Sequence, residues 1–101
     1  MAKFPIEQGI YEYLRSKDAK LLDVRTPAEY IQGHIPGSIN IPLYKLEEVE
    51  YLVEDKENPL YLYCQTGARS RMAAMQLVQM GYRNIHNIGG IAAYSGKLEC
   101  A

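Results

Sequence analysis

Residues 60–70 constrain the fold of this chain more than any other stretch. A short apolar run over 60–63 ends at Cys64, a small Gly-containing loop follows, and a segment rich in Ala, Met and Leu begins at Arg69. This order predicts a strand, a tight loop and a helix, so Cys64 is expected where loop amides and a helix N-terminus converge. Such a position binds anions and lowers the pKa of a thiol. The sequence therefore predicts thiolate chemistry on an anionic substrate.

Short apolar segments alternate with amphipathic ones along the rest of the chain. Apolar spacing and Pro and Gly punctuation predict helices over 7–16, 27–32, 43–53, 69–80 and 91–94, and strands over 20–24, 39–41, 60–63 and 84–88. The last strand is expected to stop at Gly89 and Gly90. Strands that alternate with helices across short loops are typical of α/β domains with a mostly parallel sheet. We therefore expect one α/β domain over residues 1–101, in three layers, with about five short strands flanked by helices.

Composition and charge exclude several classes of function. Eleven basic and twelve acidic residues give a formal charge of −1 with no basic stripe, so we expect no nucleic-acid partner. No segment approaches the roughly 18 consecutive apolar residues of a membrane span, and the first five residues lack the apolar stretch of a signal peptide. We therefore expect no membrane partner and a cytoplasmic location. His34 and His86 lack the spacing of a zinc site, so neither a metal nor another cofactor is expected.

The loop after Cys64 is suited to hold negative charge. A free cysteine of pKa about 8.5 is only a few per cent thiolate at neutral pH, and lowering its pKa by about 2 makes the thiolate predominate. Gly67 permits a positive φ that turns amides inward, Thr66 can add a hydroxyl donor, and Ser70 can cap the helix. The alternative is a buried structural cysteine, because free cysteine is among the most buried residue types. The predicted site comprises the nucleophile Cys64 and the binding residues Gln65, Thr66, Gly67, Ala68, Arg69 and Ser70.

Several segments, in their order along the chain, resemble the single-domain rhodanese, or thiosulfate sulfurtransferase, family. They are 22–30 (LDVRTPAEY), 33–42 (GHIPGSINIP), 64–70 (CQTGARS), and Gly81-Tyr82 with Asn87-Ile88-Gly89-Gly90, and the likeness spans about residues 5–98. The resemblance implies a rhodanese-like fold. It also implies that Cys64 takes a sulfane sulfur from a donor such as thiosulfate, becomes a persulfide, and passes the sulfur to cyanide, a thiol or a protein. Arg69 would orient the anionic donor and assist Cys64 as a second catalytic residue.

The resemblance leaves more than one function open. The same residues would serve an enzyme or a sulfur carrier that delivers to a specific protein, whereas the presence of the cysteine counts against a non-catalytic interaction domain. Phosphatases and arsenate reductases of the same fold are a further alternative, but the phosphatase loop places its arginine after five residues. Here four residues separate Cys64 from Arg69. The expected partners are a small anionic sulfur donor and a thiol or protein acceptor, and the chain is expected to be a monomer.

Residues outside the loop are expected to have supporting roles. By the same resemblance, Asp23 and Arg25 stabilise the loops around the site through ion pairs and backbone hydrogen bonds, with direct catalysis as the alternative. His34 lies in a segment rich in Pro and Gly, so we expect it to brace a turn rather than act as a general base. Cys100 lies outside the family pattern. It is either a frayed terminal thiol or a resolving cysteine that attacks the Cys64 persulfide.

Overall fold

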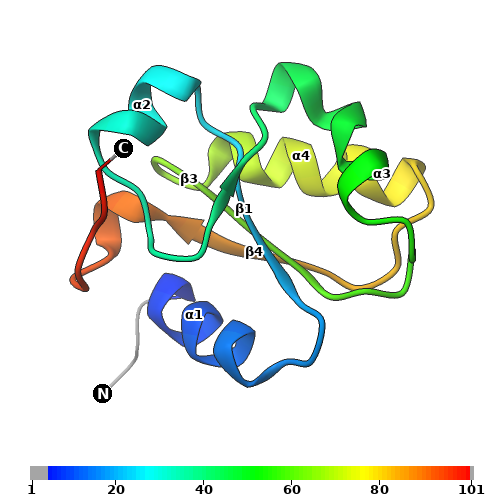
Figure 1. Cartoon of the computed structure of the whole chain (residues 1–101), viewed down its shortest axis with the longest axis horizontal. Coiled ribbons are helices and arrows are strands. Elements are labelled where there is room, and N and C mark those ends of the chain that lie inside the picture. Colours follow the sequence, from blue (N-terminus) through cyan, green and yellow to red (C-terminus); the bar gives the residue numbers. More distant parts are fainter. Residues whose placement is uncertain (1–4, 101) are drawn as a thin grey trace.

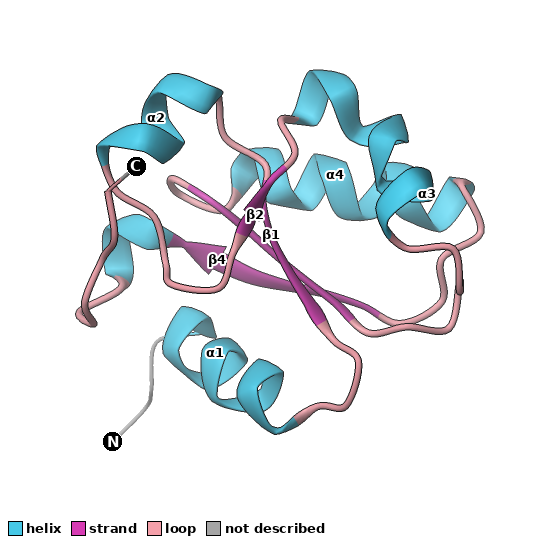
Figure 2. Cartoon of the chain, viewed as in Figure 1, coloured by secondary structure: helices cyan, strands magenta, loops and turns pink. Residues whose placement is uncertain are grey.

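Helices cover both faces of a four-stranded parallel sheet in the computed structural model of the chain (Figures 1 and 2). The structure describes residues 5–100; the first four residues, part of the segment predicted not to be a signal peptide, and Ala101 lie outside it. The elements in chain order are α1 (Pro5–Arg15), β1 (Lys20–Asp23), α2 (Pro27–Gln32), β2 (Ile39–Asn40), the 3₁₀ helix η1 (Leu43–Glu48), α3 (Val49–Leu52), β3 (Leu60–Cys64), α4 (Ala68–Gln79), β4 (Ile85–Gly90) and the 3₁₀ helix η2 (Ile91–Ala93).

The sheet has the strand order β2-β1-β3-β4, and every neighbouring pair is parallel. All strands therefore end at the same edge, and Cys64 is the last residue of the inner strand β3. This confirms the expected α/β class and parallel sheet, with four strands where about five were expected. The strands lie where the sequence predicted them, and the described segments between them are helices and loops.

The inner strand β3 is buried along its whole length, which explains its continuous apolar run. Successive side chains point to opposite faces, so Leu62 faces α4 while Tyr61 and Tyr63 face α1. Two apolar cores result, and Figure 1 shows α1 on one side of the sheet with α3 and α4 on the other. These cores fix β3 from both sides and hold the position of the residue at its end.

Helix α2 begins at Pro27, as predicted, and Thr26 is its N-cap. The Thr26 side chain accepts a hydrogen bond from the Glu29 amide, and the Glu29 carboxylate accepts one from the Thr26 amide. Together these bonds form a capping box. This reciprocal pairing satisfies donors at the helix start and fixes the Glu29 side chain beside Thr26. The orientation of that carboxylate becomes important at the candidate site.

Two predicted boundaries are wrong. The expected helix over 43–53 is a 3₁₀ segment followed by one short α-helical turn, with non-helical dihedrals at Lys45. The last strand does not stop at Gly89 but runs through Gly90, which pairs with Cys64 after a register shift in the β3–β4 ladder. Within the described residues, no helix has the length and apolar character needed to cross a membrane.

Candidate active site

The Cys64 sulfur accepts hydrogen bonds from the loop that follows it. The Gly67 amide nitrogen lies 3.0 Å from Sγ and the Ser70 amide nitrogen lies 3.4 Å from it. Gly67 has φ +102°, as predicted, and is the N-cap of α4 without a side chain that can accept. The sulfur therefore supplies the acceptor that an N-cap side chain ordinarily offers to the third helical residue.

Ser70 does not cap the helix, contrary to the prediction. It lies inside the first turn of α4 and is fully buried. Its hydroxyl is 2.7 Å from the Asn87 side-chain oxygen and 3.1 Å from the Gly67 carbonyl oxygen. A hydroxyl has one hydrogen, so donation to the neighbouring Cys64 sulfur replaces donation to either of these oxygens.

The surroundings of the Cys64 thiol lower its pKa. Burial is the largest single influence and raises it, but hydrogen bonds from the Ser70 hydroxyl and amide, and then from the Gly67 and Thr66 amides, outweigh burial. Thr66 acts here through its amide, where the sequence suggested its hydroxyl. Cys64 is thus buried, as a structural cysteine would be, and surrounded by donors that a neutral packed thiol does not need. The arrangement favours the thiolate.

Arg69, which was predicted to bind the sulfur donor, forms an ion pair with Glu29 through its guanidinium. Its two terminal nitrogens lie 2.8 and 2.9 Å from the two carboxylate oxygens, and about a third of each side chain is exposed. The hydrogen bond from Arg69 is the main cause that lowers the pKa of Glu29 to about 2. The pair joins the first turn of α4 to the first turn of α2. That Arg69 assists the reaction stays a prediction.

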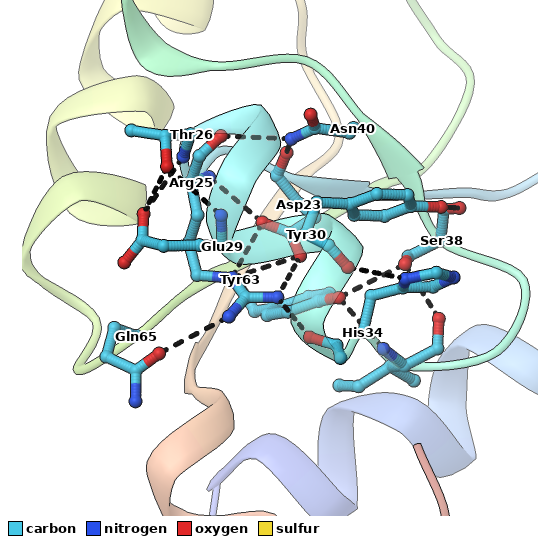
Figure 3. Close-up of polar contacts among 12 residues, drawn as sticks. Asp23, Arg25, Thr26, Glu29, Tyr30, His34, Ser38, Asn40, Tyr63 and Gln65 are labelled. Carbon is cyan, nitrogen blue, oxygen red and sulfur yellow. Dashed lines mark hydrogen bonds and ion pairs between the residues drawn. The ribbon is translucent and has the colours of Figure 1, made fainter. Parts of the chain in front are cut away.

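Asp23 and Arg25 form a buried ion pair at the end of β1 (Figure 3). Arg25 Nη2 donates to Asp23 at 2.7 Å and to the Gly33 carbonyl at 2.7 Å, while Nη1 lies 3.3 Å from the Gln65 side-chain oxygen. The Asn40 side chain donates to the carbonyl oxygens of Asp23 and Arg25. One buried cation therefore connects β1, the loop after Cys64 and the segment after α2.

Tyr63 and His34 brace the same region (Figure 3). The Tyr63 hydroxyl lies 3.1 Å from the Ile35 amide nitrogen and 3.1 Å from the Ser38 hydroxyl, and burial raises the pKa of Tyr63. The His34 ring stacks on Tyr30 with centroids 3.7 Å apart. His34 also exchanges backbone hydrogen bonds with Glu99 near the C-terminal end. These contacts place His34 in an isolated β-bridge just before the turn at Pro36 and Gly37, and none of them involves the Cys64 sulfur.

Three residues for which the sequence predicted no role in the site complete it. The Asn87 side-chain oxygen accepts the Ser70 hydroxyl and the Gly89 amide. Gly90 allows β4 to lie against the loop, and Glu29 holds Arg69. The Thr-x-x-Glu pattern of 26–29 would have indicated the capping role of Glu29, but no local pattern links it to a residue forty positions away.

A cavity of about 340 Å³ lies beside the loop and is lined by Arg25, Glu29, Gln32, Gly33, Gln65, Ile91 and Leu98. Cys64 does not line this cavity, but the next residue, Gln65, does. Cys100 is a free, exposed thiol whose sulfur donates to the Gln32 carbonyl at 3.2 Å. Within residues 5–100, no three His, Cys, Asp or Glu side chains gather as metal ligands.

Comparison with known proteins places this geometry in a family context. The profile described as Rhodanese-like domain matches residues 8–97. The chain is 40% identical over 107 residues to the uncharacterized protein YqhL of Bacillus subtilis, covering 98% of this chain and 84% of that protein. It is 41% identical over 71 residues to the thiosulfate sulfurtransferase PspE of Escherichia coli, covering 69% and 68%. A solved rhodanese with anions from E. coli superposes with a TM-score of 0.77 at 34% identity, covering 82% of this chain and 99% of that one.

Proposed function

This chain belongs to the rhodanese-like sulfurtransferase family, and we propose that it moves a sulfane sulfur from a thiosulfate-type donor through a persulfide on Cys64. The observation that carries the proposal is the buried Cys64 sulfur, which accepts the Gly67 and Ser70 amides and has a lowered pKa. PspE, named a thiosulfate sulfurtransferase, supports the choice of donor.

In the first step, the Cys64 thiolate attacks the outer sulfur of thiosulfate. A new S–S bond forms, the S–S bond of thiosulfate breaks, and sulfite leaves with its electron pair. Cys64 becomes Cys–S–S⁻, and the total charge is unchanged. The lowered pKa of Cys64 enlarges the fraction of protein that carries the thiolate, and this fraction needs no general base to react.

The amides of the loop suit this product as well as the reactant. A persulfide anion carries its charge on sulfur, and inward N–H groups at fixed positions stabilise such charge without reorganising. The Ser70 hydroxyl can add one more donor at the cost of its bond to Asn87. The positive charge of Arg69 also stabilises the anionic sulfur. Its effect is limited to the part of that charge that Glu29 does not compensate.

In the second step, a nucleophile takes the outer sulfur. Cyanide attacks through carbon, thiocyanate leaves, and the Cys64 thiolate is restored. A thiol acceptor leaves as its own persulfide by the same exchange. Whether the biological acceptor is a small thiol or a protein separates an enzyme from a sulfur carrier, because both use the same residues.

Intact mass before and after thiosulfate tests the proposal. The wild type should gain one sulfur atom and lose it after cyanide, and Cys64→Ala should gain none. Cys100→Ser should gain and lose the sulfur as the wild type does. A wild type that gains no sulfur from thiosulfate or from an organic persulfide contradicts the proposal, and hydrolysis of an aryl phosphate would then favour the phosphatase alternative.

A second assay separates turnover from delivery. Sulfur release from the persulfide is followed with glutathione as the acceptor. Rapid release supports an enzyme that serves small thiols. A persulfide that resists glutathione but yields sulfur to cyanide supports delivery to a specific protein.

A further inference from the structure

The positive charge of Arg69 is compensated by the Glu29 carboxylate. Its guanidinium forms two parallel hydrogen bonds to Glu29, at 2.8 and 2.9 Å, which is the geometry in which arginine binds a carboxylate most strongly. The pair therefore has no net charge. An anion that approaches Arg69 must either share it with Glu29 or displace the carboxylate.

Glu29 cannot readily turn away from this position. Its Oε1 accepts the Thr26 amide at 3.0 Å and the Thr26 hydroxyl at 3.1 Å, so the capping box that starts α2 also fixes the carboxylate. The Glu29 pKa of about 2 keeps the group ionised across the pH range of ordinary assays. The negative charge beside Arg69 is permanent.

The cavity beside the loop has the same balance. Among the described residues that line it, the charged ones are Arg25 and Glu29. Each already has an opposite partner, because Arg25 is paired with Asp23 and Glu29 with Arg69. A donor in this cavity meets polar groups and no uncompensated lining cation. Such an environment suits a singly charged donor better than a dianion.

We propose that Glu29 determines donor specificity: by compensating Arg69 it favours monoanionic sulfane donors, such as organic thiosulfonates and alkyl persulfides, over dianionic thiosulfate. The inference rests on the proposed sulfur transfer and concerns its substrate class. Both donor classes react by the same exchange. A thiosulfonate RSO₂–S⁻ gives its outer sulfur to the Cys64 thiolate while its S–S bond breaks and the sulfinate leaves with the electron pair.

The test compares two donors that differ by one charge, thiosulfate and methanethiosulfonate, with cyanide as the acceptor at low ionic strength. The quantity measured is the ratio of kcat/KM for thiosulfate to kcat/KM for methanethiosulfonate. Glu29→Gln should raise this ratio about threefold to tenfold, as expected for one unit charge removed near a partly solvated site. Glutamine can keep the capping box, because its side-chain oxygen still accepts the Thr26 amide.

Two further variants make the test specific to charge. Arg69→Gln should lower the ratio by a similar factor, and the double variant Glu29→Gln/Arg69→Gln should return it close to the wild-type value. Glu57→Gln is the matched control because it removes the same charge far from the site. Glu57 pairs with Arg83, and the two residues precede β3 and β4, at the end of the sheet opposite Cys64. It should leave the ratio unchanged. Added salt should shrink the difference between Glu29→Gln and wild type.

Several outcomes would overturn the inference. One is an unchanged ratio in Glu29→Gln. Another is an equal loss with both donors in each single variant and in the double variant, since a purely structural role predicts no charge rescue. If Glu29→Gln folds poorly, Arg69→Gln still decides through the same ratio, because an unchanged ratio in that variant also overturns the inference. A wild type that takes sulfur from neither donor instead contradicts the proposed function itself.

Discussion

Gly90 lies so close to Gln65 that a Cβ on Gly90 would stand 2.4 Å from the Gln65 carbonyl oxygen. The next nearest atom, the Thr66 Cα, would be 2.6 Å away. Both belong to the backbone of the loop that follows Cys64, so neither can rotate aside as a flexible side chain would. The last residue of β4 therefore sets how near the sheet can approach the loop.

Gly90→Ala is expected to displace the loop. Overpacking of this kind costs about 1–3 kcal/mol of unfolding free energy. Persulfide formation should slow by about tenfold to a hundredfold, because small errors in the position of reacting groups have large effects on rate. Denaturant unfolding and single-turnover mass spectrometry measure the two effects.

Gly81→Ala provides the control for Gly90→Ala. Gly81 has φ +101° after α4, so alanine there costs about 1–2 kcal/mol of conformational strain without touching the loop. Its rate per folded molecule should match the wild type. Equal slowing in the two variants would assign the effect of Gly90→Ala to general destabilisation.

The pKa of Cys64 is expected to lie below the ordinary value of about 8.5. Ultraviolet absorbance of the thiolate, followed against pH in Cys100→Ser, reports this group, with Cys64→Ala/Cys100→Ser as the blank. Ser70→Ala should move the midpoint upward, because it removes the hydroxyl that lowers the pKa. A wild-type midpoint at or above 8.5 would sink the prediction.

Asp23→Ala should reduce stability more than turnover. It leaves the Arg25 guanidinium buried without its carboxylate, which costs about 3–5 kcal/mol in comparable buried pairs. Thermal unfolding and kcat, corrected for the folded fraction, are compared with wild type. A large fall in kcat at an unchanged melting temperature would instead assign Asp23 a direct role in the reaction.

The Glu29–Arg69 pair should make stability depend on pH in the acid range. The pKa of Glu29 falls from 4.5 to about 2 on folding, so its contribution is full above 4.5 and is lost as the pH drops toward 2. The unfolding free energy of wild type minus that of Glu29→Gln should be constant above this window and shrink within it. A difference that does not vary across the window contradicts the pairing.

The fold was largely predictable because its signals are local. The apolar run of β3, the Pro and Thr at the start of α2 and the glycine after Cys64 each determine the conformation of their own neighbourhood. From them followed the parallel sheet, the Cys64 position at a strand end and the left-handed Gly67. The same logic failed at residues 43–52, where the apolar spacing suits a helix but the chain forms 3₁₀ turns around Lys45.

The site was less predictable because its contacts join distant segments. The Arg69–Glu29 pair spans forty positions, and the approach of Gly90 to Gln65 depends on the strand order and on the register shift of β4. Ser70 illustrates the difficulty: its position near the start of the helix suggested a cap. Its amide and hydroxyl are instead used by Cys64 and Asn87.

Because the Cys64 sulfur accepts a hydrogen bond from the Ser70 amide, it also caps the N-terminus of helix α4. Each chemical state of the sulfur then gives the first turn of α4 a different acceptor: a thiol accepts weakly and a thiolate strongly, and a persulfide moves the charge one atom outward. We therefore expect the state of the sulfur to change how readily the first turn of α4 frays. Amide hydrogen exchange at Ser70 would follow the progress of sulfur through the protein without any substrate signal.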